Sequence, residues 1–221
     1  MTAALGGWIR LLKDALLPAR DRRPLGSLRY VVLDTEFTSL DPRTNRLLSF
    51  GAVAMQGSRI LLGEQIYRVV NPGVEVPAAG ILVHGLRPED ISQASPLQDV
   101  LAELHTFVGS SIVVGHFVKL DLRVLRKESR SLGLAWPVSA VDTARAHAWL
   151  MRRQPWQEHS SEHLENLDLP SLARHYQIDP GDLHHALGDA FLTARVWQKM
   201  LSPLQQFGIN CLGDLSRIAG L

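Results

Sequence analysis

Residues 30–41 read YVVLDTEFTSLD, and this stretch organises the rest of the chain. It begins with four β-forming residues, which are followed by Asp34 and Glu36. Because residues i and i+2 of a strand point to the same face, both carboxylates are expected to leave the strand on one side. Like charges held this close repel each other, and a hard divalent cation between them would remove that cost. For Asp-x-Glu alone, a strand that ends in a polar turn is the simpler interpretation, so the other segments must decide.

The composition is typical of a globular domain. The chain has 221 residues, of which 46% are hydrophobic and 20% are charged, enough for one domain with its own core. The net charge is +1, but residues 1–29 carry a surplus of +4 and the remainder carries −3. A slightly acidic body is compatible with a carboxylate metal site, and it argues against tight, sequence-independent coating of DNA.

Cysteine content and hydropathy predict a cytoplasmic protein without a membrane segment. Cys211 is the single cysteine, which excludes an intrachain disulfide and a cysteine-rich zinc site. No apolar run reaches the roughly 20 residues that a membrane span needs. Arg10, Lys13 and Asp14 interrupt the apolar start, which does not resemble a signal peptide.

Three parts are expected along the chain. Residues 1–28 form an amphipathic helix over 5–17 and a basic linker, residues 29–201 form the main domain, and residues 202–221 form a C-terminal cap. The N-terminal part is interpreted as an appendage packed on the domain. The alternative is an arm that docks a partner or touches nucleic acid.

Hydrophobic periodicity predicts the elements of the main domain. The first strand is expected to begin at Tyr30 and to carry Asp34 and Glu36, and with strands over 46–56 and 60–70 it forms an antiparallel meander, followed by short strands over 112–115 and 138–141. Helices are expected over residues 97–108, 120–132, 142–150, 169–176 and 184–201. Residues 152–168 are polar and are interpreted as a loop, in which His159 and His163 are solvated rather than metal ligands.

Two further acids lie on separate predicted elements. Asp121 follows a buried strand at the start of a helix, where the helix dipole favours an acid and where α/β sheets also place their chemistry. Asp189 lies on a late helix, five residues after His184. Four acids and a histidine suit two-metal phosphodiester hydrolysis with Mg²⁺ or Mn²⁺. A neutral histidine, with an ordinary pKa of about 6.5, can accept the proton of the attacking water.

The order and spacing of these residues resemble the DnaQ-like 3′–5′ exonucleases of the DEDDh type, the family of the epsilon proofreading subunits of bacterial DNA polymerase III. Three motifs carry the resemblance: D-x-E-x-T at residues 34–38, H-x-x-x-x-D at 116–121 and H-x-A-x-x-D-A at 184–190. Segments VHG at 83–85, DT at 142–143 and LPSLARHY at 169–176 lie where that family has similar ones. The resemblance covers residues 29–201, and it is specific because three motifs occur in order.

The resemblance implies a ribonuclease-H-like α/β fold with a five-stranded mixed sheet flanked by helices. It implies release of nucleoside 5′-monophosphates from a 3′ end with two divalent ions, Mg²⁺ or Mn²⁺. The metal ligands would be Asp34, Glu36, Asp121 and Asp189, and the general base would be His184. The residues that it places near the terminal nucleotide are Thr35, Phe37, Thr38, Leu40, His84, His116, Phe117 and Leu120.

The chain departs from the family pattern at two motifs. The family often has D-x-E-T-T-G, whereas residues 34–39 read DTEFTS without the glycine. The family often has H-N-A-x-F-D, whereas Phe117 and Leu120 replace the asparagine and the phenylalanine that commonly meet substrate. The metal ligands are kept, so the chemistry is expected to be kept while substrate preference stays open.

The base could in principle be either of two adjacent histidines. The DEDDh spacing selects His184, five residues before Asp189, whereas a sister class uses a spacing of four with tyrosine. His185 is then expected to start the helix or to hold another residue of the site in position.

Three functions remain open from the sequence. The first is an exonuclease acting on DNA 3′ ends in proofreading or repair, and the second is an exoribonuclease of the same fold. The third is a module with weak nuclease activity that binds a partner, such as a DNA polymerase subunit, through the N-terminal arm. A pure scaffold would have no use for four repelling acids. Residues 198–201, QKML, make a poor clamp-binding motif because they continue a helix with a buried face.

Overall fold

The computed structural model describes residues 21–39, 41, 43–74, 76, 85–134, 136, 139–153 and 166–220. The helix expected over residues 5–17 lies outside these ranges, as do Leu40, His84, His159 and His163. Within the described ranges, no helix combines the length and the apolar character needed to cross a bilayer.

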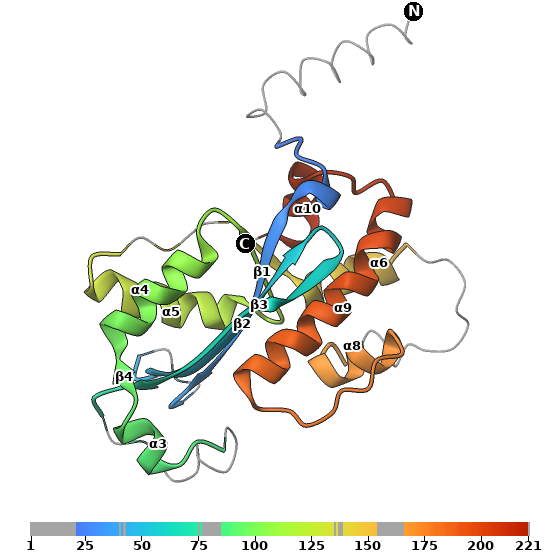
Figure 1. Cartoon of the computed structure of the whole chain (residues 1–221). Helices are drawn as coiled ribbons and strands as arrows, with labels where there is room; N and C mark the ends of the chain where they lie inside the picture. Colours follow the sequence, from blue (N-terminus) through green and yellow to red (C-terminus); the bar gives the residue numbers. More distant parts are fainter. Residues whose placement is uncertain are drawn as a thin grey trace, which may run out of the picture.

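The described residues fold around one mixed sheet (Figure 1). Its strands are β1 (Arg29–Phe37), β2 (Leu47–Gln56), β3 (Arg59–Asn71), β4 (Ser95–Pro96), β5 (Ile112–Gly115) and β6 (Ala140–Asp142). They lie in the order β4-β3-β2-β1-β5-β6. The first three form the predicted antiparallel meander, and β5 and β6 continue the sheet in parallel. The sheet has six strands rather than five, because the two-residue β4 pairs with the end of β3.

Helices cover both faces of the sheet (Figure 1). On one face lie α4 (Leu97–Val108) and α5 (Lys119–Ser131). On the other lie α6 (Thr143–Met151), α8 (Leu169–His175), α9 (Ala186–Gln206) and α10 (Leu212–Ala219). Two short elements complete the described fold: the 3₁₀ turn η1 (Leu25–Ser27), and α3 (Pro88–Ser92), which packs beside β3. The predicted helix over residues 97–108 is confirmed residue for residue by α4.

Strand β1 is buried on both faces, which explains its continuous hydrophobic run. Tyr30 and Val32 pack against the α9 side, whereas Val31 and Leu33 pack against α4 and α5. Because side chains alternate along a strand, the two acids that follow leave β1 on the α9 side. The odd-numbered neighbour Phe37 packs on the other side, against the α4 and α5 core.

Helix α9 is the long element that covers the acidic face. It continues to Gln206, beyond the predicted end at residue 201, and buries Met200, Leu201 and Leu204. The apolar half of the segment 198–201 is therefore buried in the core, whereas Gln198 and Lys199 are exposed. The chain before β1 is tied to the chain before α10, because the Leu25 N–H donates to the Asn210 carbonyl at 3.1 Å.

Candidate active site

Carboxylates from three elements meet at the end of β1. Oxygen atoms of Asp34 and Glu36 on β1 and of Asp189 on α9 lie within 4.8 Å of one another. Asp121 lies in the first turn of α5, and its Oδ1 accepts from the N–H and the hydroxyl of Thr35 at 3.0 and 2.6 Å. It lies outside the three-residue group, yet its charge contributes to raising the pKa of both β1 acids. The structure therefore brings all four predicted acids together.

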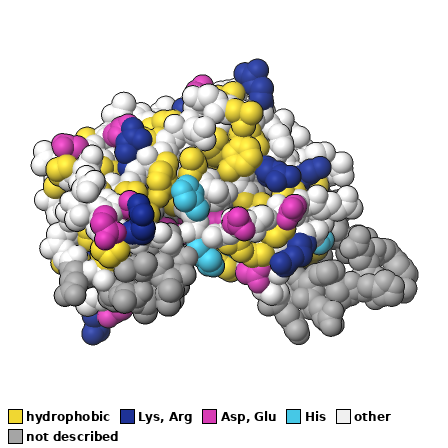
Figure 2. All heavy atoms as spheres, turned by 60° about the horizontal axis from the view of Figure 1, so that its bottom comes forward, with side chains coloured by type: hydrophobic (Ala, Val, Ile, Leu, Met, Phe, Trp, Pro, Cys, Tyr) yellow, Lys and Arg dark blue, Asp and Glu magenta, His cyan; other side chains and the backbone are white. Residues whose placement is uncertain are grey.

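Figure 2 shows the face at this end of the sheet, which is the bottom of Figure 1. Acidic, histidine and hydrophobic side chains gather there side by side. The apolar part of this surface can contact bases.

A glycine on β2 allows α9 to approach the β1 acids. Gly51 is the direct partner of Asp34 in the β1–β2 register. A Cβ atom at Gly51 would lie 2.2 Å from the backbone N and Cα atoms of Leu187, in the first turn of α9. This close backbone approach brings Asp189 to the carboxylates of β1. Gly51 was not predicted from the sequence to have a role, although a glycine inside a strand pattern signals such an approach.

Substitution of Gly51 by alanine is expected to disturb this arrangement. The new methyl group would meet backbone rather than a flexible side chain, so the start of α9 must move. We expect a loss of about 2 kcal/mol in the free energy of unfolding and a larger loss of activity, because Asp189 moves with the helix. Gly63→Ala on β3 is the matched control, since no atom lies within 4 Å of its added Cβ. Thermal denaturation and nuclease assays on both variants test this, and equal behaviour would contradict it.

Burial and mutual repulsion raise the pKa of the carboxyl groups. The pKa of Asp34 lies well above its ordinary value because the group is buried and faces the other three acids. Burial, reinforced by Asp189 and Asp121, raises the pKa of Glu36 to about 7. Burial also raises the pKa of Asp121 to about 7, although the hydrogen bonds from Thr35 act in the opposite direction. The pKa of Asp189 is raised by burial and lowered in part by the backbone N–H of a neighbouring histidine.

The donor set fits a hard divalent cation. Asp189 uses Oδ2 to accept the His184 backbone N–H at 2.9 Å. Its Oδ1 is buried and has no hydrogen-bond partner among the described residues. A buried carboxylate oxygen without a donor is costly, and a cation between Asp34, Glu36 and Asp189 would satisfy it. All ligand atoms are oxygens, which suit a hard ion.

The raised pKa values predict how metal-free protein responds to pH. An acid whose pKa is raised by folding binds more protons in the folded state, so the free energy of unfolding falls as pH rises toward the folded pKa. For Glu36 and Asp121 this loss runs from the ordinary carboxyl pKa of about 4 up to the folded pKa of about 7, above which it levels off. His116, whose pKa is lowered to about 4 by burial, acts in the opposite direction, but below about pH 6.5.

In EDTA, the melting temperature is therefore expected to fall as pH rises from about 5 to about 7.5, by roughly 5 °C, and to level off above that. Added Mg²⁺ or Mn²⁺ should restore more of it at the higher pH, where more carboxylates are ionised. Differential scanning calorimetry with EDTA and with each ion measures both effects. A melting temperature that does not change with pH in EDTA would contradict the prediction.

The two adjacent histidines have different environments. His185 is the N-cap of α9: its Nδ1 accepts from the Gly188 N–H at 3.3 Å, and its ring stacks on Tyr67 with centroids 4.6 Å apart. His184 has a φ angle of 67°, in the left-handed region that non-glycine residues seldom adopt. Its ring is exposed and makes no hydrogen bond to the described residues. Strained backbone of this kind is often retained at functional sites.

Two large apolar side chains flank Asp121. Phe117 and Leu120, which replace the family's asparagine and phenylalanine, are 45% and 43% exposed. The ring of Phe117 packs edge-on against His116, whose Nδ1 lies 2.9 Å from the Thr143 hydroxyl. His116 thus supports an exposed aromatic residue at the rim of the acidic site.

The remaining predicted substrate residues are engaged within the fold. Thr35 holds Asp121, and Phe37 packs against the core on the α5 side. Thr38 closes the β1–β2 hairpin: its N–H donates to the Arg46 carbonyl, and its hydroxyl accepts from the Arg46 N–H, both at 3.0 Å.

Two residues near the site were not assigned a role from the sequence. Tyr67 on β3 pairs with Gly51, which pairs with Asp34, so its ring reaches His185 from the third strand. The buried side chain of Asp142 caps α6 by accepting from the backbone N–H groups of residues 144 and 145. Its charge also helps to raise the pKa of Asp121. From the sequence, Asp142 was noted only as the start of a helix and as part of a segment that resembles the family, and Tyr67 could have been found only from the pairing of strands.

Comparisons with known proteins agree with this geometry. The model of the exonuclease family RNase_T matches residues 31–197. The PolC-type DNA polymerase III of Thermotoga maritima is 27% identical over 199 residues, which are 90% of this chain and 14% of that relative. The DNA polymerase III subunit epsilon of Aquifex aeolicus is 27% identical over 191 residues, which are 86% of this chain and 89% of that relative. The chain thus spans about a seventh of the PolC-type relative.

Solved structures share the fold. The E. coli exonuclease I complex with a dT13 oligonucleotide has a TM-score of 0.67 at 16% identity, covering 82% of this chain and 42% of that chain. The nuclease domain of 3′hExo, a DEDDh family member bound to rAMP, has a TM-score of 0.66 at 14% identity. The match covers 83% of this chain and 94% of that chain. These matches confirm the predicted ribonuclease-H-like architecture.

The matched family model begins on the strand that carries Asp34 and Glu36 and ends on the helix that carries Asp189. It covers well over half of the chain. The chain therefore belongs to the exonuclease family.

Proposed function

We propose that this protein removes nucleoside 5′-monophosphates from the 3′ ends of DNA by two-metal hydrolysis, in proofreading or repair. The observation that carries the proposal is the convergence of Asp34, Glu36 and Asp189 within 4.8 Å, with Asp121 beside them. Carboxylates that raise one another's pKa are a costly arrangement unless cations are bound there.

Two ions, Mg²⁺ or Mn²⁺, would be held by Asp34, Glu36, Asp121 and Asp189. When bound, they would stabilise charge on the attacking and leaving oxygens of the phosphodiester. Thr35 fixes one oxygen of Asp121, which orients the carboxylate before substrate arrives.

The exposed ring of His184 is the proposed general base. It accepts a proton from the water that attacks phosphorus, while the bond from phosphorus to the 3′ oxygen of the shortened strand breaks. That oxygen leaves with a proton taken from solvent. His185 keeps the base in place, because it caps α9 and is held by Tyr67.

The apolar rim supports a single-stranded or frayed 3′ end as the substrate. Phe117 and Leu120 offer exposed apolar surface next to Asp121. Aromatic and apolar contacts accept any base, because every base presents a π-face. An exonuclease that degrades strands of any sequence requires this tolerance.

The choice of DNA rests on the relatives, which are named as DNA polymerase III polypeptides. An exoribonuclease is the alternative, since 3′hExo was crystallised with rAMP. Association with a polymerase subunit through residues 1–28 is part of the same proposal, and it would bring the enzyme to replication forks in the cytoplasm.

A time course on 5′-labelled single-stranded DNA and RNA of matched sequence tests the proposal. With Mg²⁺ or Mn²⁺, we expect DNA products that shorten from the 3′ end, and we expect no products in EDTA. Faster shortening of RNA would favour the exoribonuclease. Absence of cleavage of both polymers with either ion would overturn the proposal.

A further inference from the structure

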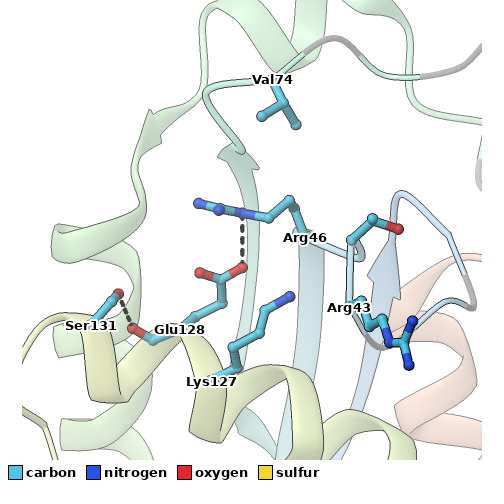
Figure 3. Close-up of a pocket in the computed structure, with 7 residues that line it drawn as sticks. Arg43, Arg46, Val74, Lys127, Glu128 and Ser131 are labelled. Atoms are coloured by element: carbon cyan, nitrogen blue, oxygen red, sulfur yellow. Dashed lines mark hydrogen bonds and ion pairs between the residues drawn. The ribbon is translucent and has the colours of Figure 1, made fainter.

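A charged cavity lies between the β1–β2 loop and α5, on the side of the sheet opposite to α9 (Figure 3). Its volume is about 460 Å³. Basic and hydroxyl side chains dominate its lining, which consists of Arg43, Thr44, Arg46, Val74, Lys127, Glu128 and Ser131. Three of these residues are cations and one is an anion, so the lining has a net positive charge.

The cations retain unused hydrogen-bond donors. Arg46 pairs through Nε with the buried Glu128 carboxylate at 3.1 Å. Its two terminal nitrogens have no partner among the described residues and can still donate hydrogen bonds. Lys127 donates to the side-chain oxygen of Asn45 at 2.9 Å and to the Asn45 carbonyl, which uses two of its three N–H groups. Arg43 is exposed and makes no ion pair within the described ranges. Figure 3 shows Arg46 and Lys127 extending from the two walls into the same space.

Both walls of the cavity continue from elements that carry the active-site acids. Arg46 is hydrogen-bonded to Thr38, which lies two residues beyond Glu36 on the same chain segment. Lys127 follows Asp121 on α5 by six residues, which corresponds to about 9 Å along the helix axis. Because the cavity lies on the α5 side of β1, a strand whose 3′ end lies at the carboxylates would have to pass around the end of β1 to reach it.

We propose that this cavity binds a backbone phosphate of the substrate strand, upstream of the terminal nucleotide. The inference rests on the proposed nuclease function and adds a positioning site to it. A guanidinium with free N–H groups matches the oxygens of a phosphate, and an ammonium adds a point charge. The active site itself presents four acids and repels the backbone of the strand. Positive charge outside it is needed to hold the substrate.

Arg43 provides the cleanest test because its side chain is exposed and supports no other described residue. Binding of a fluorescein-labelled single-stranded DNA is measured by anisotropy in EDTA, at several salt concentrations, for wild type, Arg43→Gln and Arg59→Gln. Arg59 is the matched control: it is exposed, and it lies at the opposite end of the sheet, paired with Gln56.

We expect Arg43→Gln to weaken binding several-fold at low salt. The slope of log K against log salt should become shallower by about 0.7, the value for one lost phosphate contact on a single strand. Arg59→Gln should leave the slope unchanged. Equal slopes for the two variants, or no measurable binding by wild type, would overturn the proposal.

Two additional measurements separate the alternatives. Inorganic phosphate, titrated at constant ionic strength, should weaken oligonucleotide binding by wild type more than binding by Arg43→Gln, because the free anion and the backbone phosphate would compete for the same cavity; an equal effect on both proteins would contradict a phosphate site there. The p-nitrophenyl ester of thymidine 5′-monophosphate fills only the catalytic centre, so its hydrolysis should be equal in wild type and Arg43→Gln. Failure of wild type to hydrolyse this ester and DNA would refute the proposed function, while the binding comparison would still decide the cavity.

Discussion

Replacement of Asp34 by asparagine is expected to lower the metal-dependent hydrolysis of single-stranded DNA by at least about a thousandfold. Asp34 faces Glu36, Asp121 and Asp189, and it is the acid whose pKa is influenced by all three. Asparagine keeps the size of the side chain but removes the charge that the cations need. The rate of release of a labelled terminal nucleotide, measured with Mg²⁺ and with Mn²⁺, gives the size of the effect.

The stability of this variant distinguishes a catalytic loss from a structural one. In EDTA near pH 8, Asp34→Asn should melt no lower than wild type, because it removes repulsion among buried carboxylates. Asp99→Asn, on the exposed face of α4, is the control and should keep full activity. A wild-type rate for Asp34→Asn would show that the site is misassigned, and a large drop in melting temperature would show that Asp34 has a structural role.

Local sequence patterns were sufficient to predict those features of the site that lie within a single strand or helix. The alternation of β1 places Asp34 and Glu36 on one face, and α4 was predicted with correct ends because its apolar positions repeat with helical period. The end of α9 was predicted too early. Pro203 suggests a break, but burial of Leu204 against the core keeps the helix continuous to Gln206.

Features that depend on packing between elements could not be predicted in this way. The register that pairs Asp34 with Gly51 and Gly51 with Tyr67 is a property of three strands together. Likewise, the hydrogen bonds by which the N–H and the hydroxyl of Thr35 hold Asp121 join a strand to a helix and could not be read from either segment alone. The number of strands also differs, because two residues before α4 happen to pair with the end of β3.

Replacement of His184 by asparagine is expected to lower kcat by roughly a hundredfold to ten-thousandfold, with little change in KM. Asparagine tolerates the left-handed conformation that position 184 adopts, so the loss should not come from backbone strain. His185→Asn is the matched variant, because asparagine is also a good N-cap and can replace the bond to the Gly188 N–H. It loses only the stacking on Tyr67, and a decrease of less than about tenfold is expected.

The pH dependence of kcat separates a base from a residue that only positions others. A general base acts in its deprotonated form, so the wild-type rate should rise with pH until the base has lost its proton. His184→Asn should lose this rise, because no other group takes the proton as efficiently, whereas His185→Asn should keep it. If His185→Asn instead loses both rate and pH dependence, the base is His185, four positions before Asp189. The N-cap bond and the stacking on Tyr67 would then have to break during turnover, since both occupy that ring in the present structure.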